Sequence, residues 1–273
     1  MKEGKKIFFS DLDGTLLTSD KRVSEKTKKA LDEFVAAGNH FAICTGRGID
    51  NVITVAEKLG INYPGTYYLC FNGALCFDSD NSKVINRIPV PYELIPGIFD
   101  TAKEFGVHAH TYAADYMVSP DEGEAMKFYN RVIQRPIVVT DDIVGNLPEA
   151  PCKVIAIELH EMEKLENFRK AIMERYGDRL TTVYSNPNYL EVFMKEAGKG
   201  SGVRWLAEYL GVPIENTIAA GDEQNDISMI EAAGLGIAML NATDIVKASA
   251  DVITASDNDH DGLERFLLDA VKL

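Results

Sequence analysis

The sequence predicts an α/β fold: a Rossmann-like core built on a parallel sheet, with a second, α+β domain inserted into it. Three continuous apolar runs near the N-terminus, residues 7–9, 40–44 and 67–71, are typical of strands buried on both faces. Segments with apolar residues at helical spacing separate these runs, and such alternation indicates a parallel sheet. In the middle of the chain the pattern becomes irregular and partly alternating, which indicates the second domain.

Turn-forming residues mark both junctions of the inserted domain. They lie at residues 78–82 and at Asn186-Pro187-Asn188, and we place the junctions beside them. The core is then formed by residues 1–83 and 189–273, and the inserted domain by residues 84–188. A chain of 273 residues is long enough for two domains with separate apolar interiors.

Two helices are expected in the first half of the core. The first spans residues 25–37, with Ser24 as its N-cap. The second lies between the second and third apolar runs and ends near Leu59. The apolar positions of the first helix recur at helical spacing: Ala30, Leu31, Phe34 and Val35.

The remaining elements follow from the same periodicities. In the inserted domain the expected strands are 84–90, 107–118, 153–160 and 181–184. Its expected helices are 92–105, 123–133 and 161–176. In the second half of the core the expected strands are 217–220, 235–239 and 251–253. The expected helices there are 200–210, a segment ending at Ala233, 243–249 and 263–271.

The net negative charge limits the kinds of molecule that the protein is expected to bind. A formal net charge of −14 argues against nucleic acid and anionic membranes, which attract basic surfaces. A small phosphorylated metabolite stays possible, because one metal ion and one lysine can reverse the charge locally. No apolar run approaches the roughly 18–20 residues of a membrane span, and no signal segment precedes the first strand. The four cysteines form no Cys-x-x-Cys pair. We therefore expect a cytoplasmic protein with reduced cysteines and see no sign of an obligate protein partner.

Two carboxylates follow the first strand directly. Asp11 and Asp13 are spaced i, i+2, so in an extended strand both would point the same way at the sheet's C-terminal edge. Two carboxylates so close together repel unless a cation or proton lies between them. The spacing therefore predicts a hard metal ion, and we expect Mg2+. An Asx-rich turn before Gly14 is the alternative for this short motif alone.

Polar residues also follow two other predicted strands. Thr45-Gly46-Arg47 comes after the second strand, and Gly221-Asp222 comes after the strand at 217–220. The carboxyl ends of parallel strands share one edge of the sheet, so these groups are expected near Asp11.

With these motifs the chain resembles the haloacid dehalogenase superfamily, and within it the Cof-type phosphatases that carry a large cap domain. The resemblance covers the whole chain, and all four superfamily motifs occur in order. Single motifs of this length are weak evidence, whereas the ordered set at strand ends is specific. The motifs are Asp11-Leu-Asp13-Gly-Thr15, Thr45-Gly-Arg47, Lys199-Gly and Gly221-Asp222-Glu-Gln-Asn225-Asp226, and Asn72-Gly73-Ala74 also matches a Cof-type signature.

The resemblance implies a role for each motif residue. Asp11 is the nucleophile, and Asp13 is the acid that protonates the leaving group and later the base that activates water. Lys199 supplies positive charge to Asp11 and the phosphate. The implied phosphate contacts are Thr45, Gly46, Lys199 and Asn225. The implied Mg2+ site comprises the Asp11 carboxylate, the Asp13 carbonyl and Asp222, with Asp226 in the outer shell. The resemblance assigns no definite role to Arg47.

The implied function is a magnesium-dependent phosphomonoester hydrolase that acts on small phosphorylated metabolites, such as sugar phosphates, through an aspartyl-phosphate. Residues 84–188 would then form a cap that selects the substrate. Two alternatives use the same residues: a phosphoryl transferase such as a phosphomutase, and a phosphometabolite-binding protein without catalysis.

Three other features are interpreted as structural. Asp257-Asn258-Asp259-His260-Asp261-Gly262 imitates the start of an EF-hand loop, but position twelve is Leu268 in place of the required Glu. His108 and His110 lack an evident third ligand for zinc, so a strand face is expected. Of the two lysines near the third motif, Lys199 precedes the helix-opening Gly, and Lys195 is expected to be a peripheral charge.

Overall fold

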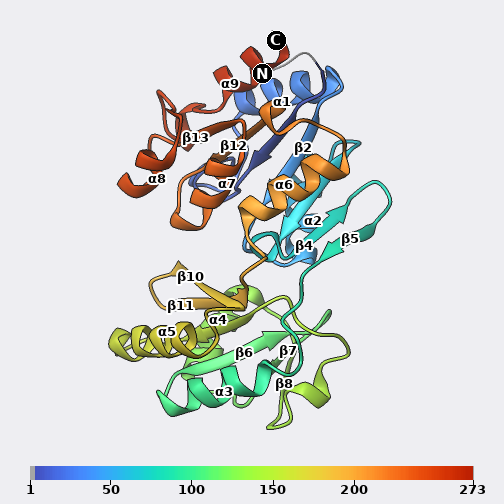
Figure 1. Cartoon of the computed structure of the whole chain (residues 1–273). Coiled ribbons are helices and arrows are strands. Elements are labelled where there is room, and N and C mark those ends of the chain that lie inside the picture. Colours follow the sequence, from blue (N-terminus) through green and yellow to red (C-terminus); the bar gives the residue numbers. More distant parts are fainter. Residues whose placement is uncertain (1–3, 273) are drawn as a thin grey trace. The chain divides into compact units, whose positions relative to one another are not determined.

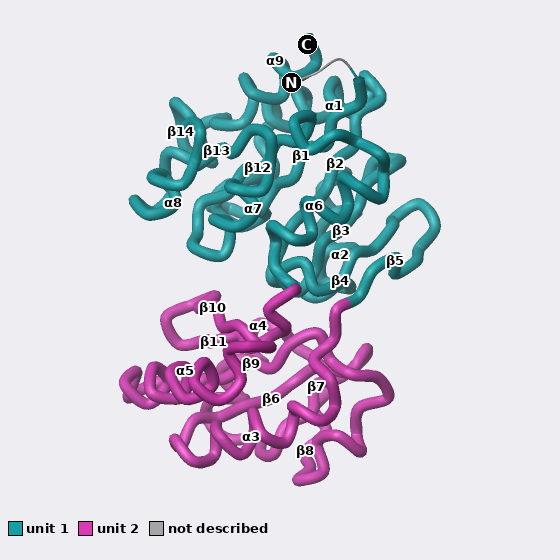
Figure 2. The backbone as a smooth tube through the Cα atoms, in the orientation of Figure 1, with its two compact units in different colours: residues 1–87, 197–273 teal, residues 88–196 magenta. Residues whose placement is uncertain are grey.

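The computed structural model describes residues 4–272, and the chain divides into two compact units. Unit 1 comprises Met1–Arg87 and Ala197–Leu273, and unit 2 comprises Ile88–Glu196 (Figures 1 and 2). Each unit has its own sheet. The predicted class, an α/β protein with a parallel-sheet core, is confirmed.

The sheet of unit 1 has eight strands in the order β14-β13-β12-β1-β2-β3-β4-β5. Its central strands are parallel, and β4 and β5 join at one edge as an antiparallel hairpin. The strands are β1 Ile7–Ser10, β2 His40–Cys44, β3 Thr66–Cys70, β4 Leu75–Asp78, β5 Lys83–Arg87, β12 Thr217–Gly221, β13 Leu235–Ala238 and β14 Val252–Ile253.

Helices cover both faces of this sheet (Figure 1). Because side chains alternate along β1, Ile7 and Phe9 pack with the α6 residue Leu206. Phe8 points to the other face, where its ring contacts Phe34 of α1 at a centroid distance of 6.2 Å. The helices are α1 Glu25–Ala36, α2 Ile49–Leu59, α6 Lys199–Tyr209, α7 Ile227–Ala232, α8 Asp244–Ser249 and α9 Glu264–Lys272, and the 3-10 turns are η1 Phe71–Gly73, η3 Ile214–Asn216, η4 Gln224–Asp226 and η5 Asn258–His260.

Unit 2 has a six-stranded sheet in the order β10-β11-β9-β6-β7-β8. On one face, Ile155 and Ile157 of β9 pack with Met126 and Tyr129 of α4. Helices α3 and α5 contact each other and the strands β6 and β10. The elements are α3 Ile95–Glu104, β6 His108–Tyr112, β7 Met117–Ser119, α4 Glu124–Ile133, β8 Ile137–Val139, η2 Val144–Asn146, β9 Val154–Ile157, α5 Met162–Tyr176, β10 Leu180–Asn186 and β11 Tyr189–Met194.

The junctions differ from the expected ones. The segment expected to open the insert as a strand over 84–90 is β5, and it pairs with β4 in the sheet of unit 1. At the other end, Asn186 ends β10, and Pro187 and Asn188 form the turn to β11, which pairs with β10 within unit 2. Hairpin turns and domain junctions use the same residues, so turn chemistry alone could not separate them. The strand expected over 107–118 is divided into β6 and β7.

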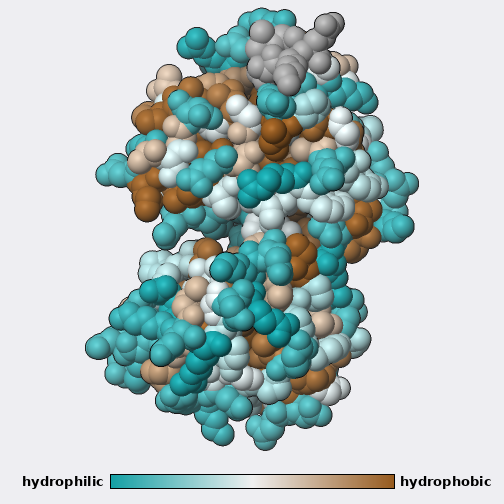
Figure 3. All heavy atoms as spheres, in the orientation of Figure 1, coloured by the Kyte–Doolittle hydropathy of each residue, from teal (hydrophilic) through white to brown (hydrophobic). Residues whose placement is uncertain are grey.

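The surface is more hydrophilic than apolar on the face that Figure 3 draws. On the face drawn in Figure 3, hydrophilic residues predominate in both units, and apolar residues occur in small groups between them. Within residues 4–272, every helix is too short or too polar to cross a lipid bilayer.

Candidate active site

Three neighbouring strand ends bring the predicted site residues together in unit 1. β1 lies between β12 and β2, and all three run parallel. Asp11 follows β1, Thr45 follows β2, and Asp222 follows β12. Asp226 ends the turn η4, four residues after Asp222. Because the carboxyl ends of parallel strands share one edge, segments far apart in the chain meet there.

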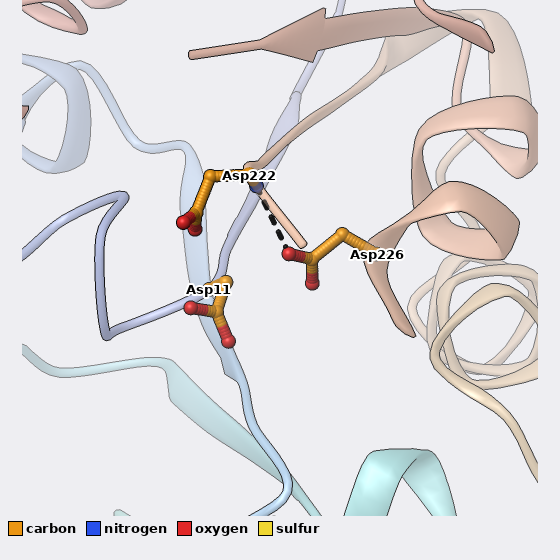
Figure 4. A group of neighbouring side chains, drawn as sticks. All are labelled: Asp11, Asp222 and Asp226. Carbon is orange, nitrogen blue, oxygen red and sulfur yellow. Dashed lines mark hydrogen bonds between the residues drawn. The ribbon is translucent and has the colours of Figure 1, made fainter. Parts of the chain in front are cut away.

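Three carboxylates form a cluster at this edge. Asp11, Asp222 and Asp226 are buried, and each offers an oxygen within 4.8 Å of the other two (Figure 4). In residues 4–272 this is the one group of three such metal-ligating side chains. Asp226 Oδ2 accepts hydrogen bonds from the backbone N–H groups of Asp222 and Glu223, both at 3.0 Å. The loop after β12 thus fixes the carboxylate of Asp226.

Lys199 provides the positive charge of the cluster. It is the first residue of α6, and its side chain is 0% exposed. Its Nζ lies 2.6 Å from Asp11 Oδ1 and 2.5 Å from Asp226 Oδ1. Burial alone would lower the pKa of Lys199, but the charges of Asp11 and Asp226 hold that pKa above its ordinary value. Lys199 is therefore an ammonium ion.

The cluster carries more negative than positive charge. Burial raises the pKa of Asp11 to about 7 against the attraction of Lys199, and Asp226 and Asp222 raise it further. Burial likewise raises the pKa of Asp222 to about 7, although its hydrogen bond from Thr15 opposes this shift. Three carboxylates and one ammonium leave two negative charges when all groups are ionised. A divalent cation would balance them.

The donor set fits a hard metal ion. Asp11 Oδ2 and Asp222 Oδ2 accept no hydrogen bond from residues 4–272, whereas both oxygens of Asp226 are engaged. Carboxylate oxygens are the ligands that Mg2+ and Ca2+ prefer. The cluster could therefore hold a metal through Asp222 Oδ2 and one oxygen of the Asp11 carboxylate, whose second oxygen then stays available, and Asp226 would orient its neighbours.

Gly14 makes room for Asp222. Its φ of +84° is a conformation that L side chains rarely adopt, and a Cβ there would lie 2.3 Å from Asp222 Oδ2. The next residue, Thr15, donates from Oγ1 to Asp222 Oδ1 at 2.7 Å. The Gly-Thr pair of the first motif thus positions Asp222.

Asp13 has partners of its own, outside the three-carboxylate cluster. Its carboxylate accepts hydrogen bonds from the Arg47 guanidinium and from Lys21 Nζ. Burial raises the pKa of Asp13, but the hydrogen bond from Lys21 and the charge of Arg47 bring it below its ordinary value. The spacing argument expected Asp11 and Asp13 to share one cation. In the structure Asp222 is the carboxylate that joins Asp11, because β1 ends at Ser10 and the chain turns before Asp13.

The remaining predicted site residues lie at the ends of β2 and β12. Thr45 is 3% exposed, and its Oγ1 accepts a hydrogen bond from the Arg47 backbone N–H at 3.2 Å. Asn225 Nδ2 donates to Asn72 Oδ1 at 3.1 Å. A Cβ on Gly46 would lie 3.3 Å from the same Asn72 oxygen. Asn72 thus lies between the second and fourth motifs.

Two residues of this region were missing from the predicted set. Asn72 had a signal, since Asn72-Gly73 stops the third apolar run and matches the Cof-type signature. Lys21 had none, because its contact with Asp13 depends on how the loop after the first motif folds. Lys195, by contrast, donates to the Gly177 carbonyl at 3.3 Å and is exposed, as expected of a peripheral charge.

A parallel-sheet core with buried carboxylates at the carboxyl ends of its strands is typical of an α/β enzyme. The haloacid dehalogenase-like hydrolase family matches residues 8–267, and the chain belongs to this family. The family resemblance and the enzyme class predicted from the sequence are thereby confirmed, and the substrates of the class are small phosphorylated compounds.

Known relatives match almost end to end. The pyridoxal phosphate phosphatase YbhA of Escherichia coli (strain K12) is 30% identical over 273 residues, which cover 96% of this chain and 97% of YbhA. The 5-amino-6-(5-phospho-D-ribitylamino)uracil phosphatase YitU of Bacillus subtilis (strain 168) is 30% identical over 264 residues, 94% of each chain. A crystal structure of a haloacid dehalogenase-like hydrolase from Bacteroides thetaiotaomicron has a TM-score of 0.84 and 26% identity, and covers 97% of this chain and 98% of that one.

Proposed function

We propose that the protein is a magnesium-dependent phosphomonoester hydrolase that forms an aspartyl-phosphate on Asp11. One observation carries the proposal: Asp11 is buried beside the Lys199 ammonium, and its Oδ2 has no hydrogen-bond partner in residues 4–272. A carboxylate with one oxygen fixed and one oxygen available is suited to act as a nucleophile.

In the first step, Asp11 attacks the phosphorus atom of the substrate. A bond forms between a carboxylate oxygen and phosphorus, and the bond from phosphorus to the leaving oxygen breaks. Asp13 gives a proton to that oxygen, so the product leaves as an alcohol. Lys199 neutralises charge on Asp11 and on the transferring group.

In the second step, water attacks the phosphorus atom of the aspartyl-phosphate. Asp13 accepts a proton from this water, the bond to Asp11 breaks, and inorganic phosphate leaves. The ion pairs of Asp13 with Arg47 and Lys21 favour its carboxylate form, which is the form this step requires. In the first step Asp13 has to carry a proton, and the same ion pairs then make it a stronger proton donor.

Asp11, Asp222 and the backbone carbonyl of Asp13 would hold Mg2+, and Asp226 would support them from the outer shell. The ion would neutralise charge between the nucleophile and the phosphate. Thr45, the Gly46 amide, Asn225 and Lys199 would bind the phosphate oxygens.

The substrate is a small phosphorylated metabolite, and we propose a sugar phosphate or a related polyol phosphate. Relatives of equal identity, YbhA and YitU, are named for chemically different substrates, so identity at this level does not select one. We assign the selection to unit 2, the inserted domain, because the motif residues all belong to unit 1.

Phosphate release from a panel of hexose, pentose and glycerol phosphates, pyridoxal phosphate and nucleotides tests the proposal. Release is expected with Mg2+, and not with a chelator or with Asp11→Asn, because an amide is a poor nucleophile. Transfer of phosphate to a second sugar in place of release would indicate a phosphomutase. Normal turnover by Asp11→Asn would exclude the aspartyl-phosphate, and tight binding without turnover would indicate a binding protein.

A further inference from the structure

The Arg47 guanidinium holds Asp13 at several points. Nε donates to Asp13 Oδ2 at 2.9 Å, and Nη2 lies 2.7 Å from Oδ1 and 2.6 Å from Oδ2. Nη1 donates to Asn51 Oδ1 at 2.8 Å. All three guanidinium nitrogens are thus engaged, two of them with Asp13. A planar fork of this kind fixes the direction and the plane of a carboxylate.

We propose that Arg47 is a positioning residue for Asp13, acting on catalysis through that carboxylate and not through the phosphate. The proposal rests on the proposed function, in which Asp13 transfers protons. Its structural basis is that Arg47 follows the phosphate-binding Thr45-Gly46 pair but turns its side chain to Asp13, while Asn51 on α2 holds the other side of the guanidinium.

Lys21 assists from the loop that also carries Asp13. Its Nζ lies 2.7 Å from Asp13 Oδ1, but its side chain is 61% exposed, compared with 27% for Arg47. The loop that carries Lys21 is tied down at Ser19, whose N–H and Oγ donate to Asp259 at 2.7 and 2.6 Å. A single exposed contact orients a carboxylate less well than a fork does, so Arg47 is the principal positioning residue.

The expected effect of Arg47→Ala on kcat/KM depends on whether the leaving oxygen has to be protonated by Asp13. An alkoxide requires a proton to depart, whereas the phenolate of 4-nitrophenyl phosphate leaves readily without one. Because kcat/KM contains only the steps through the first departure, it isolates the acid role of Asp13. Misplacing a catalytic group by about 1 Å costs about 100-fold, so Arg47→Ala should lower kcat/KM about 10- to 100-fold for alkyl phosphates.

The experiment compares 4-nitrophenyl phosphate with the alkyl phosphate that the wild type hydrolyses fastest in the panel. Arg47→Ala is expected to lower kcat/KM for the aryl ester by no more than about threefold, because the acid contribution of about 10²–10⁴ is absent there. In an Asp13→Asn background, Arg47→Ala should cause no further loss on the alkyl ester. Arg47→Lys should lie between Arg47→Ala and wild type, and Lys21→Met should cause a smaller loss than Arg47→Ala.

Arg22→Ala is the matched control. Arg22 also pairs with a carboxylate, that of Asp20, but on the exposed side of the same loop, and its removal should leave both rates unchanged. Equal losses on both esters, or multiplied losses in the double variant, would overturn the positioning role and indicate that Arg47 binds phosphate. If Asp13→Asn lowers kcat/KM equally for the alkyl and the aryl ester, Asp13 is not the acid that protonates the leaving group. The proposed function then fails, and not only the role of Arg47. Thermal unfolding of each variant separates loss of fold from loss of catalysis.

Discussion

Lys199 Nζ lies 2.6 Å from Asp11 Oδ1, although the two residues are 188 positions apart in the chain. The same ammonium also contacts Asp226, so one buried cation stabilises two buried carboxylates. Removing it would leave these charges without compensation inside the protein.

Lys199→Met should therefore impair both stability and activity. Breaking a buried ion pair from one side costs about 3–5 kcal/mol, which unfolding in urea would measure. Loss of one group that stabilises the transition state lowers kcat about 10²–10³-fold. Lys195→Met is the matched control, since Lys195 is exposed and its Nζ donates to the Gly177 carbonyl, and both quantities should stay near wild type. Similar effects of the two variants would contradict the assignment of Lys199.

Mg2+ should raise the melting temperature of the wild type through the carboxylate cluster. A ligand at 100 times its Kd stabilises the folded state by about 2.7 kcal/mol. Asp222→Asn should abolish the shift, because it removes one of the two carboxylates with an available oxygen. Asp259→Asn, outside the cluster, should retain the shift. Differential scanning calorimetry with Mg2+ and with EDTA measures both, and an unchanged shift in Asp222→Asn would place the metal elsewhere.

Gly14→Ala should displace the Asp222 carboxylate, because the new Cβ would lie 2.3 Å from Asp222 Oδ2. We expect loss of the Mg2+ shift and a fall in kcat/KM of at least about tenfold. Gly38→Ala is a close control: Gly38 has a similar φ of +87°, but nothing lies within 4 Å of its Cβ position. It should lose about 1 kcal/mol of stability from backbone strain and keep its activity. Equal activity of the two variants would refute the steric argument.

His110 should make unit 2 sensitive to acid. Its ring is fully buried, and neither nitrogen has a hydrogen-bond partner among residues 4–272. Burial, with His108 and Lys153 nearby, holds the pKa of His110 well below its ordinary value of 6.5. The unfolded chain therefore binds a proton near pH 6.5 that the folded chain rejects, so stability falls as the pH drops below 6.5.

The slope from His110 should approach about 1.4 kcal/mol per pH unit. His110→Phe should reduce this dependence of the free energy of unfolding on pH, measured by urea unfolding between pH 7 and pH 5. This range includes the ordinary pKa of histidine. His160→Gln, which replaces an exposed histidine, serves as the control. An unchanged slope in His110→Phe would contradict the prediction. It would show that the imidazole of the folded protein takes up a proton as readily as that of the unfolded chain.

The buried pair of Lys153 and Glu191 allows a double-mutant cycle in unit 2. Their side chains are 4% and 5% exposed, and Lys153 Nζ lies 2.8 Å from Glu191 Oε1. Lys153→Met should cost about 3–5 kcal/mol because it breaks a buried ion pair from one side. Adding Glu191→Leu should recover part of this loss, as measured by urea unfolding. A further loss in the double variant would show that Glu191 is stabilised by other groups.

The sequence was most informative where a strand ends in polar residues. The runs at 7–9, 40–44 and 67–71 are buried on both faces, so their periodicity identified the parallel sheet. The ends of such strands converge by geometry alone, and the meeting of Asp11 with Asp222 followed from that rule.

Contacts that depend on the path of a loop were beyond sequence reasoning. Asp13 lies after the end of β1, so the i, i+2 rule for strands did not apply to its side chain. Its contacts depend on the paths of two loops, the one after β1, which carries both Asp13 and Lys21, and the one after β2, which carries Arg47. The turn between β10 and β11 resembled a domain junction because its Asn-Pro-Asn sequence suits either.

The position of β1 between β2 and β12 has a consequence for biosynthesis. β2 emerges from the ribosome soon after β1, but β12 begins only at Thr217, beyond the whole inserted domain. At a synthesis rate of about 5–20 residues per second, the edge of β1 that pairs with β12 therefore stays unpaired for roughly 10–40 s. An unpaired apolar edge is a template for association with other chains. Fragments that stop before β12 should therefore aggregate more readily than the whole chain.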